Sequence, residues 1–584
     1  MDERTVGRET VQIVEIVQPL CANTFGVAPC NATGTADQRC FNTRATCRDS
    51  NFAGTNFALG APLSLFFASG NVAEHGVPGV SYLIPSLVSV STAPVRINMT
   101  ASNQDTQGLG NRAVCNITFA DHPHTDRIVD PYVEGRTYDP MKRGSFWTKW
   151  LVRNKYRQNV LIRVYEGYSG QALSDMTKRT YFLQSVGNPD SGGRVTIQGK
   201  DILARVEERK AQIPAASPGV LVADITATQM SIEVARATVA DYPAPGTVRV
   251  GDETMSYTAV APSAYGVILT LNSRATNNTT AATHSALDGV QLCLLMNGFR
   301  VDDAINVLLR ASGIDPAYLD LAQWAAEIDD YLSLFILNAF YTEPTPITKI
   351  VSDIQEQAQV YVWWDERFAL VRLRAVRGIG ANVPLLTAES HILAGSFSVQ
   401  EKPRERVSQL WIYYRRKDWI KDRDDPAAYV SPLVIADLES ETAVKYGEPS
   451  IRKVYANWIT SEALASTSGV KIMARNVEIP SECKFRMDAK DRAYWVGDTV
   501  TISHHLDVDA YGNRRLQNWT IVSAEEVVPG EVVEYIAENT TLYGTVAFVM
   551  ADGSPDYTVP VVGSAYIGDS LGLLPDGTTC ARIS

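Results

Sequence analysis

The pattern of apolar and polar side chains predicts a chain built mainly from β-strands. Residues 9–20 alternate loosely between polar and apolar positions, as a half-buried strand does. Short β-branched runs recur over 83–119, separated by Gly, Asn and Asp, which predicts an antiparallel sheet or barrel. Strands are expected again at 160–165 and 194–197, and an amphipathic helix is expected before them at 144–158.

The middle of the chain changes character twice. From about 220 to 295 the charge falls and Thr, Val and Ala dominate, which predicts a small all-β insertion. Apolar residues at helical spacing then predict helices at 301–311, 324–332 and 344–354. Two strands follow around a tight turn at 365–367. This region is therefore expected to be α/β.

Strands dominate the last third of the sequence, and the segment after Thr540 is rich in Gly and Pro. The predicted fold is multidomain and mainly β, with one α/β domain and tube-like β-barrels. The predicted regions are a cysteine-cluster region at 1–60, a first barrel at 61–215, a small all-β insertion at 216–296, an α/β domain at 297–400, a second barrel region at 401–540 and an extended C-terminal arm at 541–584.

The composition argues against two functional classes, dedicated nucleic-acid binders and proteins with a membrane-spanning helix. The chain has 584 residues, of which 45% are hydrophobic, and this is enough to bury several cores. It carries 53 Lys and Arg against 65 Asp and Glu, which argues against a dedicated nucleic-acid binder. No apolar run approaches the roughly 18 residues that a membrane span needs. The first residues show no signal-peptide pattern, so the cysteines are expected to be reduced in a cytoplasm.

Four of the eight cysteines lie close together, with the spacing Cys21-x8-Cys30-x9-Cys40-x6-Cys47. Thiolates gathered in this way suit an iron–sulfur cluster or zinc, and the intervals lack the Cys-x2-Cys pairs typical of zinc fingers. An iron–sulfur cluster is the preferred interpretation. Zinc, two disulfides or free thiols remain alternatives.

The other four cysteines are scattered singly and are not expected to be ligands. Cys115 and Cys293 occur in apolar, strand-like runs, where cysteine acts as a small buried hydrophobe. Cys483 and Cys580 have more polar neighbours, and we expect them to be partly exposed.

Three further segments could carry chemistry, but each has a simpler interpretation. The run 121–126 contains two His and two Asp, and the Pro between the histidines favours a structural turn over a metal site. The basic and aromatic stretch 136–163 predicts a partner contact or a solvated helix face rather than single-stranded nucleic-acid binding. Residues 507–513 indicate a hairpin turn rather than a calcium loop. No nucleophile elbow, phosphate-binding loop or His-Glu-x-x-His motif occurs, so no catalytic residues are predicted.

The cysteine run resembles proteins from the tail tips of long-tailed, siphovirus-type bacteriophages. These proteins include the hubs of gene transfer agents and the lambda-type tail-tip iron–sulfur protein. In that family, four cysteines with eight residues inside the first pair and six inside the last bind a [4Fe–4S] cluster. Both intervals match here, whereas the middle interval of nine is shorter than in the lambda-type protein.

Other segments are similar to the same family, with less specific motifs. Residues 130–133 and 192–197 look like parts of the first hub barrel, as does the run Arg143 to Trp147. Residues 363–367 look like part of the α/β hub domain, and 496–502 like part of the later barrel.

The resemblance implies a structural role without catalysis. It implies a homotrimeric hub that joins the tail tube to the distal tip and forms part of the DNA channel, with Cys21, Cys30, Cys40 and Cys47 holding a structural [4Fe–4S] cluster. The implied partners are the tail tube or distal tail protein, the tape-measure protein and a central tip or fibre protein. DNA would be met only in passage, and this chain would not insert stably into a membrane. The expected location is the virion tail tip, after assembly in the host cytoplasm. The alternative is a tail-associated wall hydrolase or a cluster-dependent redox enzyme.

Overall fold

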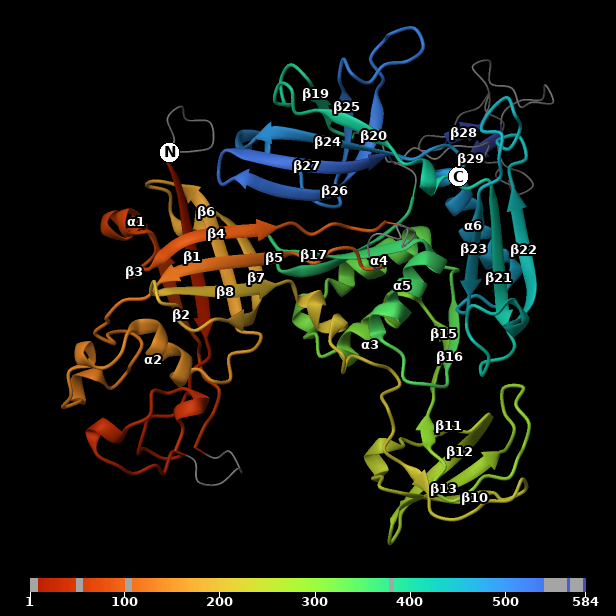
Figure 1. The fold of residues 1–584 in the computed structure, drawn as a ribbon, viewed down its shortest axis with the longest axis horizontal. Helices are drawn as coiled ribbons and strands as arrows, with labels where there is room; N and C mark the ends of the chain where they lie inside the picture. Colours follow the sequence, from red (N-terminus) through yellow and green to blue (C-terminus); the bar gives the residue numbers. More distant parts are fainter. Residues whose placement is uncertain are drawn as a thin grey trace. The chain divides into compact units, whose positions relative to one another are not determined.

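The structure is a computed structural model that describes residues 9–48, 56–99, 108–377 and 383–539, together with the backbone of 565–567 and 581–583. The chain divides into two compact units, Met1–Thr541 and Leu542–Ser584. The fold is multidomain and mainly β, as predicted (Figure 1). In the second unit, β28 (Ala565–Ile567) pairs antiparallel with β29 (Ala581–Ile583). The rest of the predicted arm and Cys580 lie outside the described residues.

The first sheet has eight strands in the order β3-β2-β1-β6-β7-β8-β5-β4 and curves into a nearly closed barrel (Figure 1). Burial alternates along β5, which places Cys115, Ile117 and Phe119 inside. Helix α2 adds Trp147 to the same core, stacked on Phe67. The elements of this barrel are β1 (Thr10–Gln18), β2 (Leu63–Ala68), α1 (Gly70–His75), β3 (Leu83–Pro85), β4 (Leu87–Ala93), β5 (Val114–Ala120), α2 (Phe146–Arg153), β6 (Leu161–Tyr168), β7 (Thr177–Val186) and β8 (Arg194–Lys200).

A six-stranded antiparallel sheet follows and encloses a hydrophobic core of its own. One buried carboxylate, Glu253, accepts hydrogen bonds from Arg274 and His284 at one end of this core. The strands are β9 (Val220–Leu221), β10 (Ser231–Ala235), β11 (Gly246–Val250), β12 (Glu253–Pro262), β13 (Gly266–Ser273) and β14 (Val290–Leu292).

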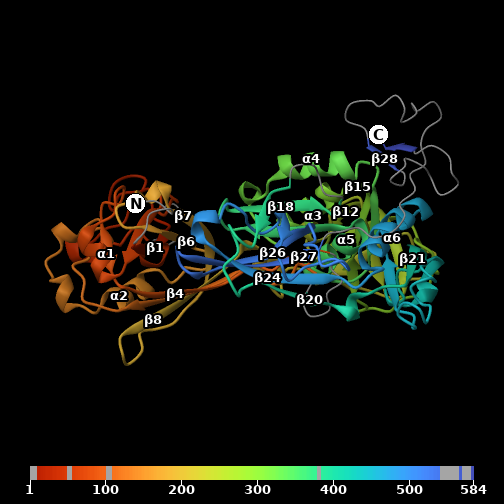
Figure 2. The same ribbon diagram turned by 90° about the horizontal axis from the view of Figure 1, so that it is seen from above.

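The α/β region combines four helices with two two-stranded sheets and one three-stranded sheet over one core. Helices α3 and α5 lie against each other in both views (Figures 1 and 2). The elements are β15 (Leu294–Phe299), α3 (Val301–Ala311), α4 (Leu321–Tyr331), β16 (Leu337–Tyr341), α5 (Ile347–Ala358), β17 (Val360–Asp365), β18 (Leu370–Ala375), β21 (Gln409–Arg416), β22 (Tyr429–Ala436), β23 (Ile451–Ala456) and α6 (Glu462–Asn476).

A second β-sheet has the order β19-β25-β26-β27-β24-β20 and shares one continuous core with the first barrel. The backbone joins them as well, because the Ile97 amide donates to the Val522 carbonyl at 2.9 Å. The strands are β19 (Leu385–Thr387), β20 (Ser398–Glu401), β24 (Ser481–Asp488), β25 (Thr499–Ser503), β26 (Gln517–Val528) and β27 (Val532–Asn539).

Buried charges connect these parts of the first unit. The Arg179 guanidinium, on β7 of the barrel, pairs with Glu166 on β6 at 2.9 Å and with Glu526 on β26 at 2.7 Å. Close by, the Trp495 indole donates to the Glu366 carboxylate at 3.2 Å, in the turn between β17 and β18. All of these side chains are almost fully buried. The first barrel, the second sheet and the β17–β18 hairpin therefore meet at one polar junction.

Candidate metal centre

The cysteines lie in a loop that connects β1 to β2 and spans residues 19–62, which we call the cysteine loop. The base of this loop is closed by its own backbone. The Ala22 amide donates to the Ala58 carbonyl and the Gly60 amide donates to the Leu20 carbonyl, both at 2.8 Å. Gly60 is required by this approach, because a Cβ there would lie 2.8 Å from the Ala22 backbone.

The four cysteines predicted as ligands all line one pocket. The Cys21 amide donates to the Asn42 carbonyl at 2.7 Å, which brings the first cysteine beside the segment that carries the third. Cys30 is buried, and the other three are partly exposed. Cys47 follows the short 3-10 helix η2 (Arg44–Thr46), and its backbone amide donates to the Arg44 carbonyl. The structure thus brings together all four residues that the sequence singled out.

The thiols also interact electrostatically with one another. Burial raises the pKa of the Cys40 thiol, and the neighbouring Cys47, Cys30 and Cys21 raise it further, against a hydrogen bond from the Asn42 backbone. None of the described cysteines forms a disulfide. A bound cation would favour the thiolate form, which is the form that ligates metals.

The distances between possible ligand side chains determine which kind of metal site they could form. Within the described residues, no three His, Cys, Asp or Glu side chains form a group tight enough to hold a metal ion. A tetrahedral zinc site with Zn–S bonds of about 2.3 Å needs its sulfurs within about 4 Å of each other. The four cysteines line one pocket without forming such a group.

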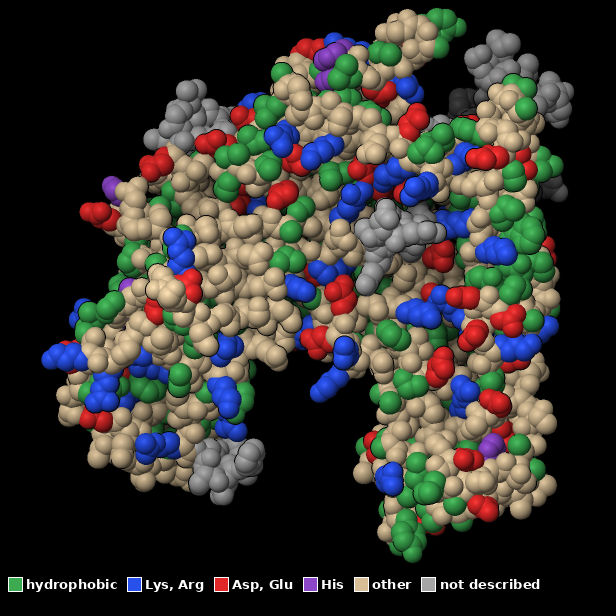
Figure 3. Space-filling view, in the orientation of Figure 1, with side chains coloured by type: hydrophobic (Ala, Val, Ile, Leu, Met, Phe, Trp, Pro, Cys, Tyr) green, Lys and Arg blue, Asp and Glu red, His purple; other side chains and the backbone are tan. Residues whose placement is uncertain are grey.

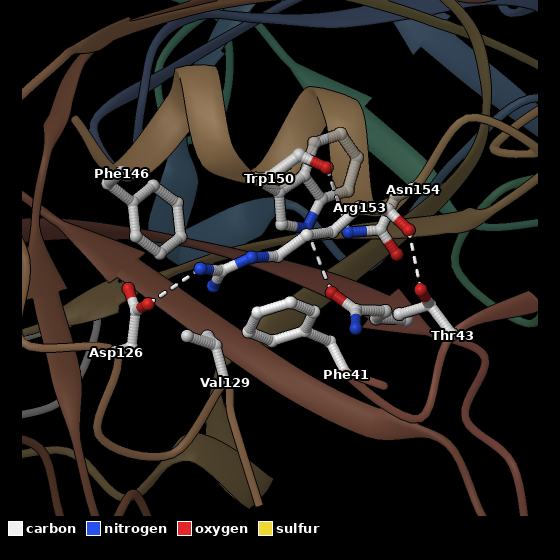
Figure 4. Close-up of a pocket in the computed structure, with 9 residues that line it drawn as sticks. Phe41, Thr43, Asp126, Val129, Phe146, Trp150, Arg153 and Asn154 are labelled. Atoms are coloured by element: carbon white, nitrogen blue, oxygen red, sulfur yellow. Dashed lines mark hydrogen bonds and ion pairs between the residues drawn. The ribbon is translucent and has the colours of Figure 1, made fainter. Parts of the chain in front are cut away.

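The cysteine loop is seated on helix α2 of the barrel (Figure 4). Phe41, next to Cys40, lies against the Arg153 guanidinium at 3.8 Å. The Thr43 hydroxyl donates to the Arg153 carbonyl at 2.6 Å, and the guanidinium pairs with the buried Asp126 at 2.7 Å. These contacts fix the segment between Cys40 and Cys47 on the barrel.

The 121–126 run has a structural role, but the expected turn lies directly after it, at 127–129, and Pro123 bridges to Ser145. The His122 ring stacks on Phe146. Although burial raises the pKa of Asp126, hydrogen bonds from His124, Arg153 and Lys149 outweigh it and lower the pKa. Asp126 is therefore the counter-charge for two cations of α2. Residues 507–513 also form the expected turn, closed by the Asp509 amide donating to the Asn513 carbonyl.

The interpretation of 136–163 as an exposed contact segment needs correction. Its aromatic residues Phe146, Trp147 and Trp150 are buried in the barrel core. Its basic residues Arg136 and Arg153 are turned toward the cysteine loop and pair with Asp130 and Asp126. The segment connects the barrel to the cysteine loop. No local pattern indicates this connection, because the carboxylate partners precede the helix and the contacts with the loop span about a hundred residues.

The scattered cysteines are buried wherever they are described. Cys115 and Cys293 are buried as predicted, and burial raises the pKa of each thiol to about 12. Cys483 was expected to be partly exposed, and this is wrong because alternation along β24 turns it into the shared core at 0% exposure.

Comparisons with known proteins found low structural similarity. No protein-family model matches the sequence. No curated protein matches it either. The 43 kDa tail protein of prophage MuSo2 from Shewanella oneidensis aligns with a TM-score of 0.36 and 8% identity, over 78% of this chain and 98% of that one. A tail protein from Neisseria meningitidis MC58 gives 0.35 and 10%, over 77% and 97%. The prophage tail protein gp18 from Listeria monocytogenes EGD-e gives 0.26 and 11%, over 55% and 88%. Similarity at this level does not establish a shared fold.

In the described part of the chain, no helix is both long enough and apolar enough to cross a bilayer.

Proposed function

We propose that this chain is a structural hub protein of a bacteriophage tail tip, with a [4Fe–4S] cluster held by Cys21, Cys30, Cys40 and Cys47. The observation that carries the proposal is the convergence of these four thiols on one pocket beside the first barrel. Their spacing is the feature of the sequence that resembles tail-tip proteins. The cluster, when bound, would supply a rigid covalent centre for the loop.

The charge around the pocket supports an anionic centre. A cluster ligated by four thiolates is negatively charged overall, and a buried negative charge needs nearby cations. The described part of the cysteine loop carries Arg39, Arg44 and Arg48 against one acid, Asp37. Lys and Arg side chains gather over the lower left of Figure 3, where Figure 1 places α2 and the cysteine loop.

The β architecture supports the hub role. A nearly closed eight-stranded barrel and a second six-stranded sheet share one core, so a single chain could present two barrel-like walls to a tail tube. Three chains would then offer six such walls. In this proposal the chain is a homotrimer that contacts the tail tube or distal tail protein, the tape-measure protein and a central tip or fibre protein, while DNA passes through.

The test is iron and sulfide analysis of anaerobically purified protein, together with native mass spectrometry. We expect about four iron and four sulfide per chain, as a [4Fe–4S] cluster requires, and a trimer. Cys30→Ser should abolish the brown colour and broad absorption, whereas Cys115→Ser should leave both unchanged. Zinc with no sulfide would refute the cluster. A stable dimer, or a monomer that hydrolyses cell wall, would refute the hub role.

A further inference from the structure

We propose that Arg136 is a positioning residue that holds the second half of the cysteine loop in the shape needed for ligation before a cluster is inserted. This inference rests on the proposed function. The Arg136 side chain is fully buried although it carries a charge. Its guanidinium donates to four backbone carbonyls of the loop, those of Ala36, Asp37 and Arg39 at 3.3 Å and that of Cys40 at 3.2 Å.

The direction of the guanidinium is fixed from the barrel side. Asp130, which is 2% exposed, receives two hydrogen bonds from Arg136, through Nε and through Nη2. The same carboxylate accepts from the Tyr132 amide at 3.0 Å. A planar guanidinium can serve a carboxylate on one edge and carbonyls on the other, whereas an ammonium has no such fork. Lysine is therefore not an equivalent residue at this position.

Arg136 also holds the ring that follows Cys40. Phe41 lies between two guanidinium groups, 4.2 Å from that of Arg136 and 3.8 Å from that of Arg153. Such contacts contribute about 0.5–2 kcal/mol each, with the higher values at desolvated sites. Because Phe41 is bonded to Cys40, fixing its ring restricts where the Cys40 thiol can point.

None of these contacts involves a sulfur atom. They use backbone carbonyls, the Phe41 ring and the Thr43 hydroxyl, so they persist whether or not the thiols are ligated. Many small metal sites are unfolded until the metal binds. Here the barrel supplies the shape of the Cys40–Cys47 half before any cluster is inserted.

The experiment compares full-length wild type with Arg136→Lys and, as matched control, Arg143→Gln. Arg143 is an exposed cation of the same segment that stacks on Tyr138 and makes none of the four carbonyl contacts. Cluster-free protein is incubated anaerobically with iron, sulfide and dithiothreitol, and absorption is followed with time. In parallel, a maleimide labels the cluster-free protein, and mass spectrometry gives the labelling rate at Cys40. Thermal unfolding reports whether each variant is folded.

We expect Arg136→Lys to slow cluster insertion and to speed Cys40 labelling by about tenfold or more, the size of effect seen when residues that orient metal ligands are changed. Arg143→Gln should match the wild type in both rates. If Arg136→Lys does not fold, Phe41→Leu keeps the apolar volume, loses the cation–π contacts, and should shift both rates in the same direction. Unchanged insertion and labelling in the folded variant would overturn the inference. If the wild type binds no iron and sulfide, the cluster proposal fails, while the labelling comparison still decides the role of Arg136.

Discussion

Replacing Glu366 with Gln should remove a large part of the pH dependence of stability in the first unit. Glu366 lies in the turn between β17 and β18 with 3% exposure. Its carboxylate accepts from the Trp495 indole, and its backbone carbonyl accepts from the Thr180 amide at 2.8 Å. The side chain therefore sits where the hairpin, the first barrel and the second sheet meet.

Burial raises the pKa of Glu366 to about 7, and the neighbouring Asp365 adds to the rise, while Arg179 opposes it. In the unfolded chain the same group titrates near 4.5. The native state therefore holds a proton between these values that the unfolded state has lost. This contribution to stability is complete below pH 4.5 and is lost as pH rises through 7. The difference of about 2.5 pH units corresponds to about 3 kcal/mol.

Glutamine keeps the shape and the acceptor for Trp495 but cannot ionise. Thermal unfolding of wild type, Glu366→Gln and the exposed control Glu343→Gln would be measured from pH 5 to 8.5. The wild type and the control should lose stability with rising pH, whereas Glu366→Gln should show a flatter profile and a higher Tm at pH 8. Equal slopes in all three proteins, or a wild type that gains stability up to pH 8, would refute the reasoning.

Three further outcomes follow from single sites. Cys115→Ser should destabilise the first barrel by about 1–3 kcal/mol, because a hydroxyl would be buried among apolar groups, and should leave the iron content unchanged. Gly60→Ala should open the base of the cysteine loop, which proteolysis would detect, because its Cβ would meet the Ala22 backbone. Although burial raises the pKa of Glu253, hydrogen bonds from Arg274 and His284 outweigh it and lower the pKa to about 2. Its stabilising effect is therefore present above pH 4.5 and lost as pH falls toward 2, so the protection factors of amides in the β9–β14 sheet, relative to their intrinsic exchange rates, should fall below pH 4.

Elements with strong local patterns could be predicted closely. The helix expected at 301–311 is α3, because its apolar residues recur at helical spacing and cover one buried face. The hairpin around 365–367 is β17–β18, with the turn where the charged residues interrupt two apolar runs. Asp201, a residue type typical of helix N-caps, caps the 3-10 helix η6 (Ile202–Glu207) by accepting from the Ala204 amide. In these cases the signal is contained within a few neighbouring residues.

Helix α6 shows where the sequence was insufficient. The last third was expected to be mostly strands, yet Glu462–Asn476 is helical. Its residues include Ser, Thr and Gly, which favour helices poorly. Gly469 faces the three-stranded sheet so closely that a Cβ would meet the Ile435 and Ile412 side chains at 2.4 and 2.9 Å. Tertiary packing against a sheet, which only the fold reveals, therefore selects this helix.

Only part of the candidate site could be predicted from the sequence. Cysteine spacing predicted which thiols would converge, because a shared centre restricts how far apart its ligands can lie in the chain. The residues that shape the loop, Arg136, Phe41 and Arg153, carried no such signal. The contacts that they make between the loop and the barrel span about a hundred positions, and a basic residue in a polar segment normally indicates solvent exposure.

The loop itself explains why a covalent centre would be needed here. Within the described residues from Cys21 to Arg48, only Cys30 and Ala32 are buried hydrophobic side chains. Ordering each backbone residue costs about 1–2 kcal/mol, and a segment of this length without an apolar core cannot recover that cost by burial. Hydrogen bonds at the base and the Arg136 contacts fix parts of the loop. Four bonds to one cluster would tie the Cys30 and Cys47 segments to the same centre. The cluster-free protein should therefore keep its barrel and its 36–43 segment protected from proteases, while becoming cleavable between Gly26 and Cys30, where the chain is exposed. Equal protection of both segments after the cluster is removed would show that the loop does not depend on a centre.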